Sequence, residues 1–509
     1  MKDLFNKGMR LFLSARYRRI NEFLEAPHET QKRVFHELLR QGSQTEYGRK
    51  YGFSHINDPK SYAKKVPVQG YEDIKPYIDR MMMGEADILW PGFVRWFSKS
   101  SGTTTGKSKF IPVPKENLFG SHIRGSWDTI TIMYQNFPES RLFADKSLVM
   151  GGSLDTFEGN PDTKIGDVSA IMLYHMPIFA RPFYTPDLET ALLPNWDEKI
   201  ERMARICTEE SVTMFGGVPT WTIVLFRRIL EMTGKDNMLE VWPDLRAYIH
   251  GGVGFDPYRE QFKEFVPSDE FIYQEVYNAS EGYFAIQDHF NEKGMLLMLD
   301  NSIYYEFIPR EEWGKEFPET VTLKEVELGE TYALVISTNA GLWRYTPGDT
   351  VTFTSLDPYR IMISGRTKQF INAFGEEVMV GNTDKAIART CEEFDAIVSE
   401  YTVAPVYIED GQKGGHEWLI EFAREPGDLD AFSRKLDLNL QAINSDYEAK
   451  RYKDMALSNL RIKTLPENTF IEWMRRRGKI GGQNKVPRLC NSREYVDQIL
   501  SFIEEKSRV

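Results

Sequence analysis

Cysteine is scarce in this sequence and forms no recognisable pattern. The 509 residues include 3 cysteines, which are Cys207, Cys391 and Cys490. They lie far apart and are odd in number, which excludes a disulfide framework and the paired spacings of zinc sites. This usage is typical of the reducing cytoplasm, where we expect the protein to be located.

Long hydrophobic runs and long basic runs are missing as well. No stretch reaches the length that spans a membrane, and charges interrupt residues 1–16 too often for a signal-peptide core. The 63 basic and 75 acidic residues give a formal charge of −12. This balance argues against nucleic acid or an anionic membrane as a partner. The histidines His28, His36 and His55 lack the spacing of metal ligands.

Apolar and aromatic residues are abundant enough for a folded core. Hydrophobic residues make up 41% of the chain and aromatic residues 13%, as is usual for an ordered globular protein. A chain of 509 residues exceeds what one hydrophobic core normally serves. We therefore expect at least two domains.

The most distinctive segment is a loop rich in serine, threonine and glycine, Ser98–Phe110. It follows an apolar run, 94–97, that predicts a strand. The backbone N–H and hydroxyl groups of such a loop, together with Lys107 and Lys109, are suited to bind a polyphosphate. The alternative is a flexible surface turn, for which the same residue types are common.

The spacing of the glycines disfavours one class of phosphate-binding protein. Gly102 and Gly106 are separated by three residues, whereas a Walker loop has four residues between its glycines before the Lys-Ser pair. The P-loop NTPases therefore become a weaker interpretation.

A strand–helix–strand pattern begins near residue 200. Apolar runs at 212–215, 245–250 and 271–276 predict strands, with helices between them. Each run ends in a turn that carries glycine or a Ser-Glu pair, namely Gly216–Thr220, Gly251–Gly254 and Tyr277–Gly282. Ligands of open α/β sheets bind beyond the carboxyl ends of the strands, so these turns are candidates for a binding site.

The whole pattern predicts an α/β fold with α+β parts. Residues 1–366 are expected to form a large N-terminal domain of mixed sheets with flanking helices, with a small β-barrel in the alternating segment 294–354. The composition changes at Gly365–Lys368. Residues 367–509 are expected to form a smaller, mobile C-terminal α+β domain, with helices near 381–393 and 428–446 and strands near 397–408 and 416–422.

Four segments occur in the order of the core motifs of the adenylate-forming superfamily, which includes acyl-CoA synthetases, luciferases and peptide-synthetase adenylation domains. They are Ser100–Lys107, Tyr277–Glu281, Tyr345–Asp349 and Gly365–Gly375. The sequence more closely resembles the acyl-acid amido synthetases of the auxin-responsive promoter family. This resemblance rests on the Ser-Ser-Gly-Thr-Thr form of the loop, on Ser280-Glu281, and on Gln483–Arg488 near the C-terminus.

The resemblance implies an enzyme of the ligase class that needs ATP and Mg²⁺. Such enzymes activate a small carboxylic acid to an acyl-adenylate, release pyrophosphate and transfer the acyl group to an amino acid. Because the carboxylate is itself the nucleophile, the protein must position two anions and neutralise the charge that develops at the α-phosphorus. An acid–CoA ligase shares this first step and is the alternative. A third interpretation is a sensor that binds nucleotide and acid without turnover.

The resemblance assigns the nucleotide site residue by residue. The phosphates would lie on the loop residues Ser100, Ser101, Gly102, Thr103, Thr104 and Thr105. Tyr277 would stack on adenine and Ser280 would contact the α-phosphate. Asp349 would accept hydrogen bonds from the ribose, and Arg366 would also contact ATP. Tyr277 could instead be a core aromatic, and Asp349 an ordinary turn residue.

Two residues are implied to be catalytic. Glu281 would bind Mg²⁺, which favours a carboxylate together with phosphate oxygens, although it could instead be a charge favoured by a helix dipole. Lys485 would reach the α-phosphate and the carboxylate, with Lys479 as the competing candidate. Lys368 is expected to be a hinge for a rotation between the two half-reactions. The presence of both Glu281 and Lys485 disfavours the sensor.

The chain departs from the superfamily pattern at several positions. Asn278 replaces a usual glycine, Thr346-Pro347 replaces Arg-Thr, and Asn372 stands where many relatives have lysine. None of these removes a charge that the first half-reaction needs.

The acyl pocket is the least distinct part of the sequence. The turn between a predicted strand and helix carries Phe215, Val218, Pro219, Thr220 and Trp221, which would suit a small aromatic or aliphatic acid. The same residues could equally belong to the core. No residue is identified as the base that deprotonates the acceptor amine.

Overall fold

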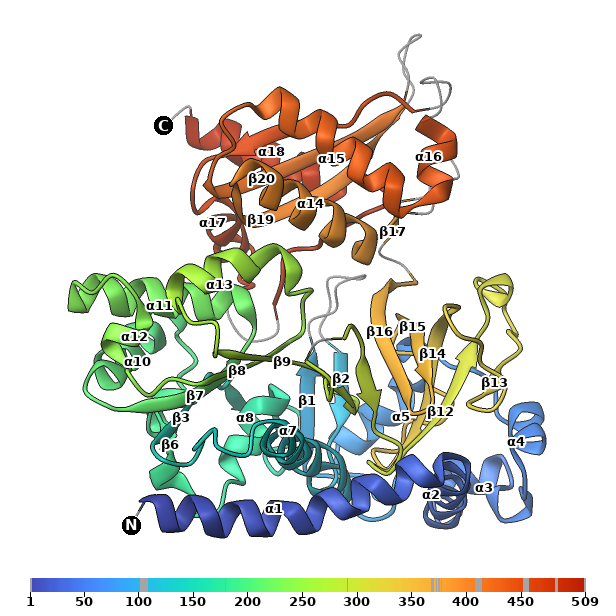
Figure 1. The fold of residues 1–509 in the computed structure, drawn as a ribbon. Coiled ribbons are helices and arrows are strands. Elements are labelled where there is room, and N and C mark those ends of the chain that lie inside the picture. The colour runs from blue at the N-terminus through green and yellow to red at the C-terminus, as the bar shows by residue number, and fades with distance from the viewer. Residues whose placement is uncertain are drawn as a thin grey trace. The chain divides into compact units, whose positions relative to one another are not determined.

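The computed structural model describes most of the chain, in two compact units (Figure 1). The described residues are 2–100, 109–178, 180–290, 292–367, 370–371, 373, 376, 378–407, 414–451, 457–480 and 484–507. Unit 1 comprises Met1–Val218, Val224–Gly252 and Ser268–Ile363, and unit 2 comprises Pro219–Ile223, Val253–Pro267 and Ser364–Val509.

The N-terminal part of unit 1 is helical, as the sequence predicts. The helices are α1 (Lys2–Glu25), α2 (Pro27–Gly42), α3 (Glu46–Lys50), η1 (Phe53–His55), α4 (Pro59–Lys65) and α5 (Tyr71–Met82). Local chemistry sets their starts. Pro27 occupies the first turn of α2, and the Asp58 carboxylate accepts the Ser61 N–H at 3.0 Å to cap α4.

A sheet of 12 strands forms the body of unit 1, in the order β13-β12-β14-β15-β16-β11-β10-β9-β8-β7-β3-β6. Its first half in sequence contains β3 (Lys146–Val149), β6 (Tyr184–Thr185), β7 (Val212–Gly217), β8 (Ala247–Gly251), β9 (Ile272–Ala279) and β10 (Gly282–Ile286). Neighbours from β6 to β9 pair in parallel. The predicted strand–helix–strand pattern is confirmed.

The other half of this sheet is antiparallel. Its strands are β11 (Met295–Leu297), β12 (Ile303–Ile308), β13 (Val321–Thr322), β14 (Thr331–Thr338), β15 (Asp349–Leu356) and β16 (Tyr359–Arg366). The small barrel expected here is wrong for the strands that the structure describes. Because β11 pairs with β16 on one side and with β10 on the other, these strands extend the open sheet instead of closing on themselves.

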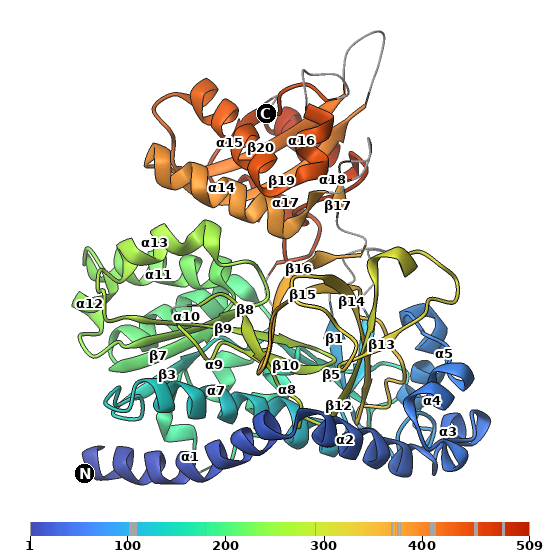
Figure 2. The same cartoon turned by 45° about the vertical axis from the view of Figure 1, so that its right-hand side comes forward.

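Helices alternate with the parallel strands along the chain. They are α7 (Ile123–Asn136), α8 (Val168–Tyr174), α9 (Leu188–Ala191), α10 (Trp196–Thr208), α11 (Pro219–Thr233), α12 (Met238–Val241), η4 (Asp256–Tyr258) and α13 (Arg259–Phe265). Shorter elements of unit 1 are α6 (Lys115–Asn117), the π-helical turn η2 (Leu118–His122), η3 (Arg181–Phe183) and η5 (Arg310–Glu312). Figure 2 shows α1 and α7 at the lower side of the unit 1 sheet. Helix α11 starts with Pro219 and is followed by Gly234, whose φ of 65° is the left-handed conformation that favours glycine.

A second sheet of unit 1 supports the Ser/Thr/Gly loop. Its order is β2-β1-β5-β4, with β1 (Trp96–Ser100), β2 (Lys109–Pro112), β4 (Leu154–Thr156) and β5 (Lys164–Gly166). Strands β1 and β2 pair antiparallel, with Ser100 opposite Lys109. Residues 101–108, which join them, lie outside the described residues. The predicted strand before the loop is confirmed.

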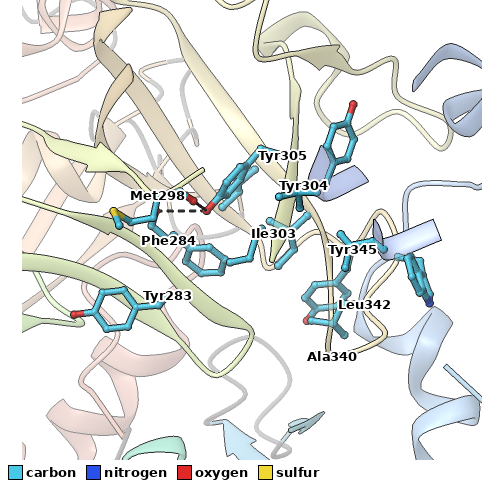
Figure 3. Packing of buried hydrophobic residues seen from close by; sticks show 14 of the residues in the cluster. Tyr283, Phe284, Met298, Ile303, Tyr304, Tyr305, Ala340, Leu342 and Tyr345 are labelled. Atoms are coloured by element: carbon cyan, nitrogen blue, oxygen red, sulfur yellow. Dashed lines mark hydrogen bonds between the residues drawn. The ribbon is translucent and has the colours of Figure 1, made fainter. Parts of the chain in front are cut away.

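Aromatic residues dominate the core of unit 1 around the 340–345 turn. Tyr283, Phe284, Tyr304, Tyr305 and Tyr345 are all less than 6% exposed and belong to one cluster (Figure 3). The Tyr305 hydroxyl donates to the Met298 carbonyl at 3.2 Å. This hydrogen bond ties β12 to the residue that follows β11 inside the core.

Unit 2 contains the predicted C-terminal α+β arrangement. Its sheets are β19-β20-β21 and β17-β18, formed by β17 (Phe370–Ile371), β18 (Val378–Met379), β19 (Ile397–Val406), β20 (Gly415–Arg424) and β21 (Arg461–Leu465). Its helices include α14 (Val380–Phe394), α15 (Leu429–Ile443), α16 (Ser445–Arg451), α17 (Thr469–Arg476) and α18 (Glu494–Ser507). In the described part of the chain, no helix is both long and apolar enough to cross a bilayer.

Candidate functional site

The turn between β9 and β10 consists of two polar residues that are both buried. Ala279 pairs with Gly282, so Ser280 and Glu281 alone form the turn. Ser280 is 3% exposed and Glu281 is 6% exposed. A hairpin turn normally faces water, and a buried carboxylate is costly without partners. This turn is therefore a specialised feature of unit 1.

Two other segments hold this turn. From β1, the Ser98 hydroxyl donates to the Ser280 hydroxyl at 2.9 Å. From the turn before β15, the Tyr345 hydroxyl donates to Glu281 Oε1 at 3.4 Å. The strand that enters the Ser/Thr/Gly loop and the segment that carries Asp349 thus both contact the Ser280–Glu281 turn.

Tyr277 and Asp349, which are 72 residues apart in sequence, are in direct contact. The Tyr277 hydroxyl donates to Asp349 Oδ2 at 2.7 Å. The Tyr277 ring lies 4.7 Å from the ring of Phe284 and is 5% exposed. Asp349 is the first residue of β15 and is half-buried. The structure brings together the residues predicted for adenine and for ribose.

A helical segment that the sequence did not single out also contacts the turn. The Ser121 hydroxyl accepts the N–H of Tyr283 at 3.1 Å. His122, the next residue, is 1% exposed, and burial lowers its pKa to about 4. Sequence gives no signal for His122, since a single histidine in an apolar helical segment is usually a core residue.

Arg344 fixes the segment that carries Tyr345. Its backbone has a φ of 44°, in the left-handed region, and its side chain is 3% exposed. The guanidinium donates to both Glu306 oxygens at 3.1 Å, and further to the Ala63 and Val66 carbonyls and to Thr320 Oγ1. A non-glycine residue holds this conformation only when its surroundings enforce it.

The five residues predicted for the acyl pocket have different surroundings. Phe215 is 1% exposed and stacks on Tyr248 with ring centroids 4.3 Å apart, inside the core of unit 1. Val218 precedes α11 and is half-buried. Pro219, Thr220 and Trp221 form the start of α11 and belong to unit 2. The acyl pocket remains a prediction.

The C-terminal candidates lie in unit 2. Lys485 is half-buried, and Arg366 is the last residue of β16. Burial and the nearby charge of Arg477 lower the pKa of Lys479. The proposed hinge Lys368 and the loop residues Ser101, Gly102, Thr103, Thr104 and Thr105 lie outside the described residues, as does Gln483.

Arg488, three residues after Lys485, is the centre of a buried charge network in unit 2. Its guanidinium donates to the Glu400 carboxylate and to the Tyr258 hydroxyl, and lies 3.9 Å from Asp384. Burial raises the pKa of Glu400 to about 7 and also raises that of Asp384. Two residues of β19 donate hydrogen bonds to this segment. The Thr402 hydroxyl donates to the Pro487 carbonyl, and the Val403 N–H donates to the Arg488 carbonyl. The Lys485 segment is therefore anchored immediately after the lysine.

A groove of about 1220 Å³ on unit 1 contains none of these candidates. Residues of α1, α2 and the 115–124 segment line it. Much of its charge is already paired: Arg16 with Asp128 and Asp300, Arg124 with Asp300, and Arg40 with Glu37. We therefore place the candidate site at the Ser280–Glu281 turn.

Metal ligands are not clustered in the part of the chain that the structure describes. No group of three or more His, Cys, Asp or Glu side chains could hold a metal ion there. Mg²⁺, however, usually binds one or two protein carboxylates and completes its shell with phosphate oxygens and water. A single buried carboxylate such as Glu281 is compatible with that mode.

Models of one family match three parts of the chain. The GH3 family N-terminal domain matches residues 16–150 and 154–271, the GH3 family central domain 296–366, and the GH3 family C-terminal domain 381–494. The chain is 25% identical to indole-3-acetic acid-amido synthetase GH3.3 of Arabidopsis thaliana, over 90% of this chain and 88% of that relative. It is 21% identical to 4-substituted benzoates-glutamate ligase GH3.12 of the same plant, over 91% and 92%.

Solved structures share the fold. A GH3.15 acyl acid amido synthetase superimposes with a TM-score of 0.77 at 18% identity, covering 97% of this chain and 96% of that chain. A 2-hydroxyisobutyryl-CoA ligase in the postadenylation state superimposes with a TM-score of 0.60 at 12% identity, covering 93% and 91%. At these identities the likeness concerns the fold.

Proposed function

Because the chain belongs to the GH3 family and is an enzyme of the ligase class, we propose that it activates a carboxylic acid with ATP and conjugates it to an amino acid. The observation that carries this proposal is the buried Ser280–Glu281 turn, held beside the entry to the Ser/Thr/Gly loop. Adenylation requires that a phosphate and a metal ligand be presented together, and this turn offers a hydroxyl and a carboxylate at adjacent positions.

The nucleotide would bind at the strand ends of unit 1 that lie next to the Ser280–Glu281 turn. Its phosphates would meet Ser100 to Thr105 and the Ser280 hydroxyl. Asp349 would accept the ribose hydroxyls with a carboxylate that Tyr277 orients by its 2.7 Å hydrogen bond. Tyr277 would present its ring to adenine, and Arg366 would contact the nucleotide from the end of β16. Each group acts by holding ATP in one orientation, which lowers the entropic cost of the reaction.

Glu281 would be the protein ligand of Mg²⁺, which neutralises charge on the phosphate oxygens when it is bound. The carboxylate is 6% exposed and is oriented by Tyr345. Lys485 would donate to the carboxylate of the acid and to the α-phosphate. Phe215, Val218, Pro219, Thr220 and Trp221 would bind the body of the acid, and Lys368 would be the hinge between half-reactions.

The test is acid-dependent release of pyrophosphate from ATP and Mg²⁺. A panel of aryl, indole and fatty acids is assayed with each acid alone, with pooled amino acids and with CoA. We expect release with at least one acid and an amide product, detected by mass, when amino acids are present. A thioester formed with CoA and no amide would reassign the enzyme to the acid–CoA ligases. ATP binding without release across the panel would support a sensor.

A matched pair of variants tests the role of Glu281. Glu281→Gln keeps the size of the side chain but removes the charge, and we expect at least about a 100-fold loss of release because the metal loses its protein ligand. Glu270→Gln removes an exposed carboxylate shortly before β9 and should leave the rate unchanged. Equal activity of the two variants would exclude Glu281 as the metal ligand.

A further inference from the structure

Three helical segments of unit 1 surround the groove of about 1220 Å³. They are α1, α2 and the stretch 115–124, which runs from α6 through η2 into α7. In both ribbon views α1 and α2 run along the lower side of unit 1, and α7 lies beside α1 (Figures 1 and 2). None of the described residues assigned to ATP, Mg²⁺ or the acid lines this groove. At its described residues, the groove is therefore separate from the candidate site.

Helix α2 presents one charged face to the groove. Its polar lining residues are spaced three or four apart, at Arg33, His36, Glu37, Arg40 and Gln41. This spacing places them on one side of the helix, with Arg33 and Arg40 about 10 Å apart along the axis. The groove therefore extends along about two turns of α2.

Basic side chains also line the groove from the other two segments. Helix α1 contributes Arg16 and Arg19, α6 contributes Lys115, and α7 contributes Arg124. Among the described lining residues, six are Arg or Lys and four are Asp or Glu. The formal charge of the whole chain is −12. The excess of basic groups in the groove is thus opposite in sign to the charge of the protein.

Buried carboxylates hold two of these arginines in place. Arg16 and Arg124 both pair with Asp300, which is 8% exposed, and Arg16 also pairs with Asp128. Burial lowers the pKa of Arg124, and the charges of Arg16 and Arg19 act in the same direction. The two aspartates therefore offset two guanidinium groups of this cluster, and Arg19 adds a third.

Arg19, Arg33 and Lys115 are the basic groups most accessible to a ligand. All three are exposed, and none of them forms an ion pair with a carboxylate of the described residues. They belong to α1, α2 and α6, so a ligand in the groove meets a cation from each of three segments. Guanidinium groups bind phosphates and carboxylates through paired N–H donors.

An accessible aromatic ring lies among these charges. Phe119 of η2 lines the groove and is 45% exposed. Val34, Leu38 and Trp90 add buried apolar side chains to the lining. Ligand sites commonly combine apolar and aromatic walls with a few charged groups, and aromatic rings stack on nucleobases. The groove thus offers a planar apolar contact together with several cations.

These features favour an elongated ligand that carries several negative charges and a flat ring. A single carboxylate would engage one guanidinium, whereas the arginines of α2 alone extend over about 10 Å. A nucleotide with two or three phosphates is long enough to meet several cations and has a base for Phe119. The groove volume of about 1220 Å³ exceeds the range of about 300–1,000 Å³ that is typical of small-ligand sites, which also suits an extended molecule.

We propose that this groove is a second anion-binding site, which binds a nucleotide with two or more phosphates independently of the proposed reaction. The phosphates contact Arg19, Arg33 and Lys115, with Arg40 further along the face of α2. The base stacks on Phe119. The groove residues all belong to unit 1, so the site is complete within that unit.

Two matched double variants of the full chain test the site. The first combines Arg19→Gln with Arg33→Gln and removes two cations of the groove. The second combines Arg18→Gln with Lys32→Gln and removes the neighbouring exposed cations, which do not line the groove. Both change the net charge equally, so a difference between them reports the groove and not the charge of the protein. Thermal unfolding identifies any general loss of structure.

The first measurement is calorimetric titration with ADP, in EDTA and without any acid. We expect the wild type and the Arg18/Lys32 variant to bind ADP alike. The Arg19/Arg33 variant should lose one ADP site or bind it at least about tenfold more weakly, because hydrogen bonds from charged groups are removed. Equal ADP binding in the two double variants, or no ADP binding to the wild type, would overturn the proposal.

The second measurement tests the contact with the base. Phe119→Leu keeps an apolar side chain but removes the ring, and we expect it to weaken ADP binding about three- to tenfold. Binding of tripolyphosphate, which has no base, should stay within about twofold. Equal losses for both ligands, or none for ADP, would overturn the assignment to a nucleotide.

A third titration separates this inference from the proposed function. Glu281→Gln, which impairs the proposed reaction, should retain the ADP site that the Arg19/Arg33 variant loses. Retention supports the groove site even if no acid in the panel is activated, in which case the proposed function alone fails. Loss of the same ADP site in Glu281→Gln would place that site at the Ser280–Glu281 turn and overturn the groove.

Discussion

Each unit of this protein buries an arginine against carboxylates, but the two arrangements differ in balance. In unit 1, Arg344 faces one carboxylate, Glu306, and three neutral oxygens. In unit 2, Arg488 faces two carboxylates, Glu400 and Asp384, whose pKa values are both raised by burial. The first network is balanced in charge, and the second carries an excess of acid.

The two charge networks should respond differently when one charged partner is removed. A balanced pair cannot relieve the loss of its acid by shedding a proton, because arginine does not titrate in the physiological range. An acid-rich network can relieve the loss of its arginine by taking up protons. Arg344 should therefore hold the Tyr345 segment in place at any pH near neutrality. The stability that the Arg488 network provides should instead depend on pH. Substitutions in the two networks should therefore differ in how their effects depend on pH.

The largest effect is expected from Glu306→Gln. The substitution leaves the Arg344 charge buried, with its side chain 3% exposed, and without a counter-charge. Loss of one partner from a buried pair costs about 3–5 kcal/mol. Denaturant unfolding of the full chain measures this free energy. Glu37→Gln, which removes an exposed partner of Arg40, should cost at most about 1 kcal/mol. Similar values for the two variants would show that the Arg344 pair is not a strong constraint.

A smaller, pH-dependent effect is expected from Arg488→Met. Without the guanidinium, Glu400 and Asp384 bind protons near neutral pH, since their pKa values are already raised. The loss of unfolding free energy should therefore be about 2 kcal/mol smaller at pH 6 than at pH 8. The loss in Glu306→Gln should be the same at both values. A pH-independent loss in Arg488→Met would contradict the difference between the two networks.

Glu400→Gln should produce a still smaller change, visible only in the pH profile. The folded-state pKa of Glu400, about 7, lies above the ordinary value of 4.5. The folded protein thus binds more protons than the unfolded chain between these values, and this contribution to stability is lost as pH rises through 7. The decrease in unfolding free energy from pH 5 to pH 8 should be smaller in Glu400→Gln than in the wild type. An unchanged decrease would show that a group other than Glu400 causes this pH dependence.

Sequence predicted the parts of the fold that depend on local patterns. The parallel strands β7, β8 and β9, their turns, and the C-terminal helices and strands lie where the apolar runs and glycines indicate. The Ser280-Glu281 pair was found because its two polar residues follow an apolar strand directly. These features are encoded over a few neighbouring residues, which is the range that periodicity can report.

Features that depend on distant contacts could not be predicted in this way. The expected barrel is wrong because β11 pairs with β10 on one side. The alternation of apolar and polar residues in 294–354 does not indicate which strand lies beside β11. The hydrogen bond between Ser121 and Tyr283 joins segments far apart in sequence. The left-handed backbone of Arg344 occurs at a residue type that normally avoids it, so only its buried partners reveal it.

The smallest expected effect is that of Tyr345→Phe, which tests whether the Arg344 fixation extends to the candidate site. Both backbone groups of Tyr345 are bonded to Ile336 at 2.8 Å, so the ring should stay in place while its 3.4 Å hydrogen bond to Glu281 is lost. We expect a stability loss below about 1.5 kcal/mol and a rise of about two- to fivefold in the Mg²⁺ concentration for half-maximal pyrophosphate exchange. Tyr62→Phe removes a nearby hydroxyl bonded to Ser337 at 2.8 Å and should leave this concentration unchanged. If both variants need the same Mg²⁺ concentration, Tyr345 supports the core but does not orient Glu281. In that case the Arg344 network does not influence the candidate site.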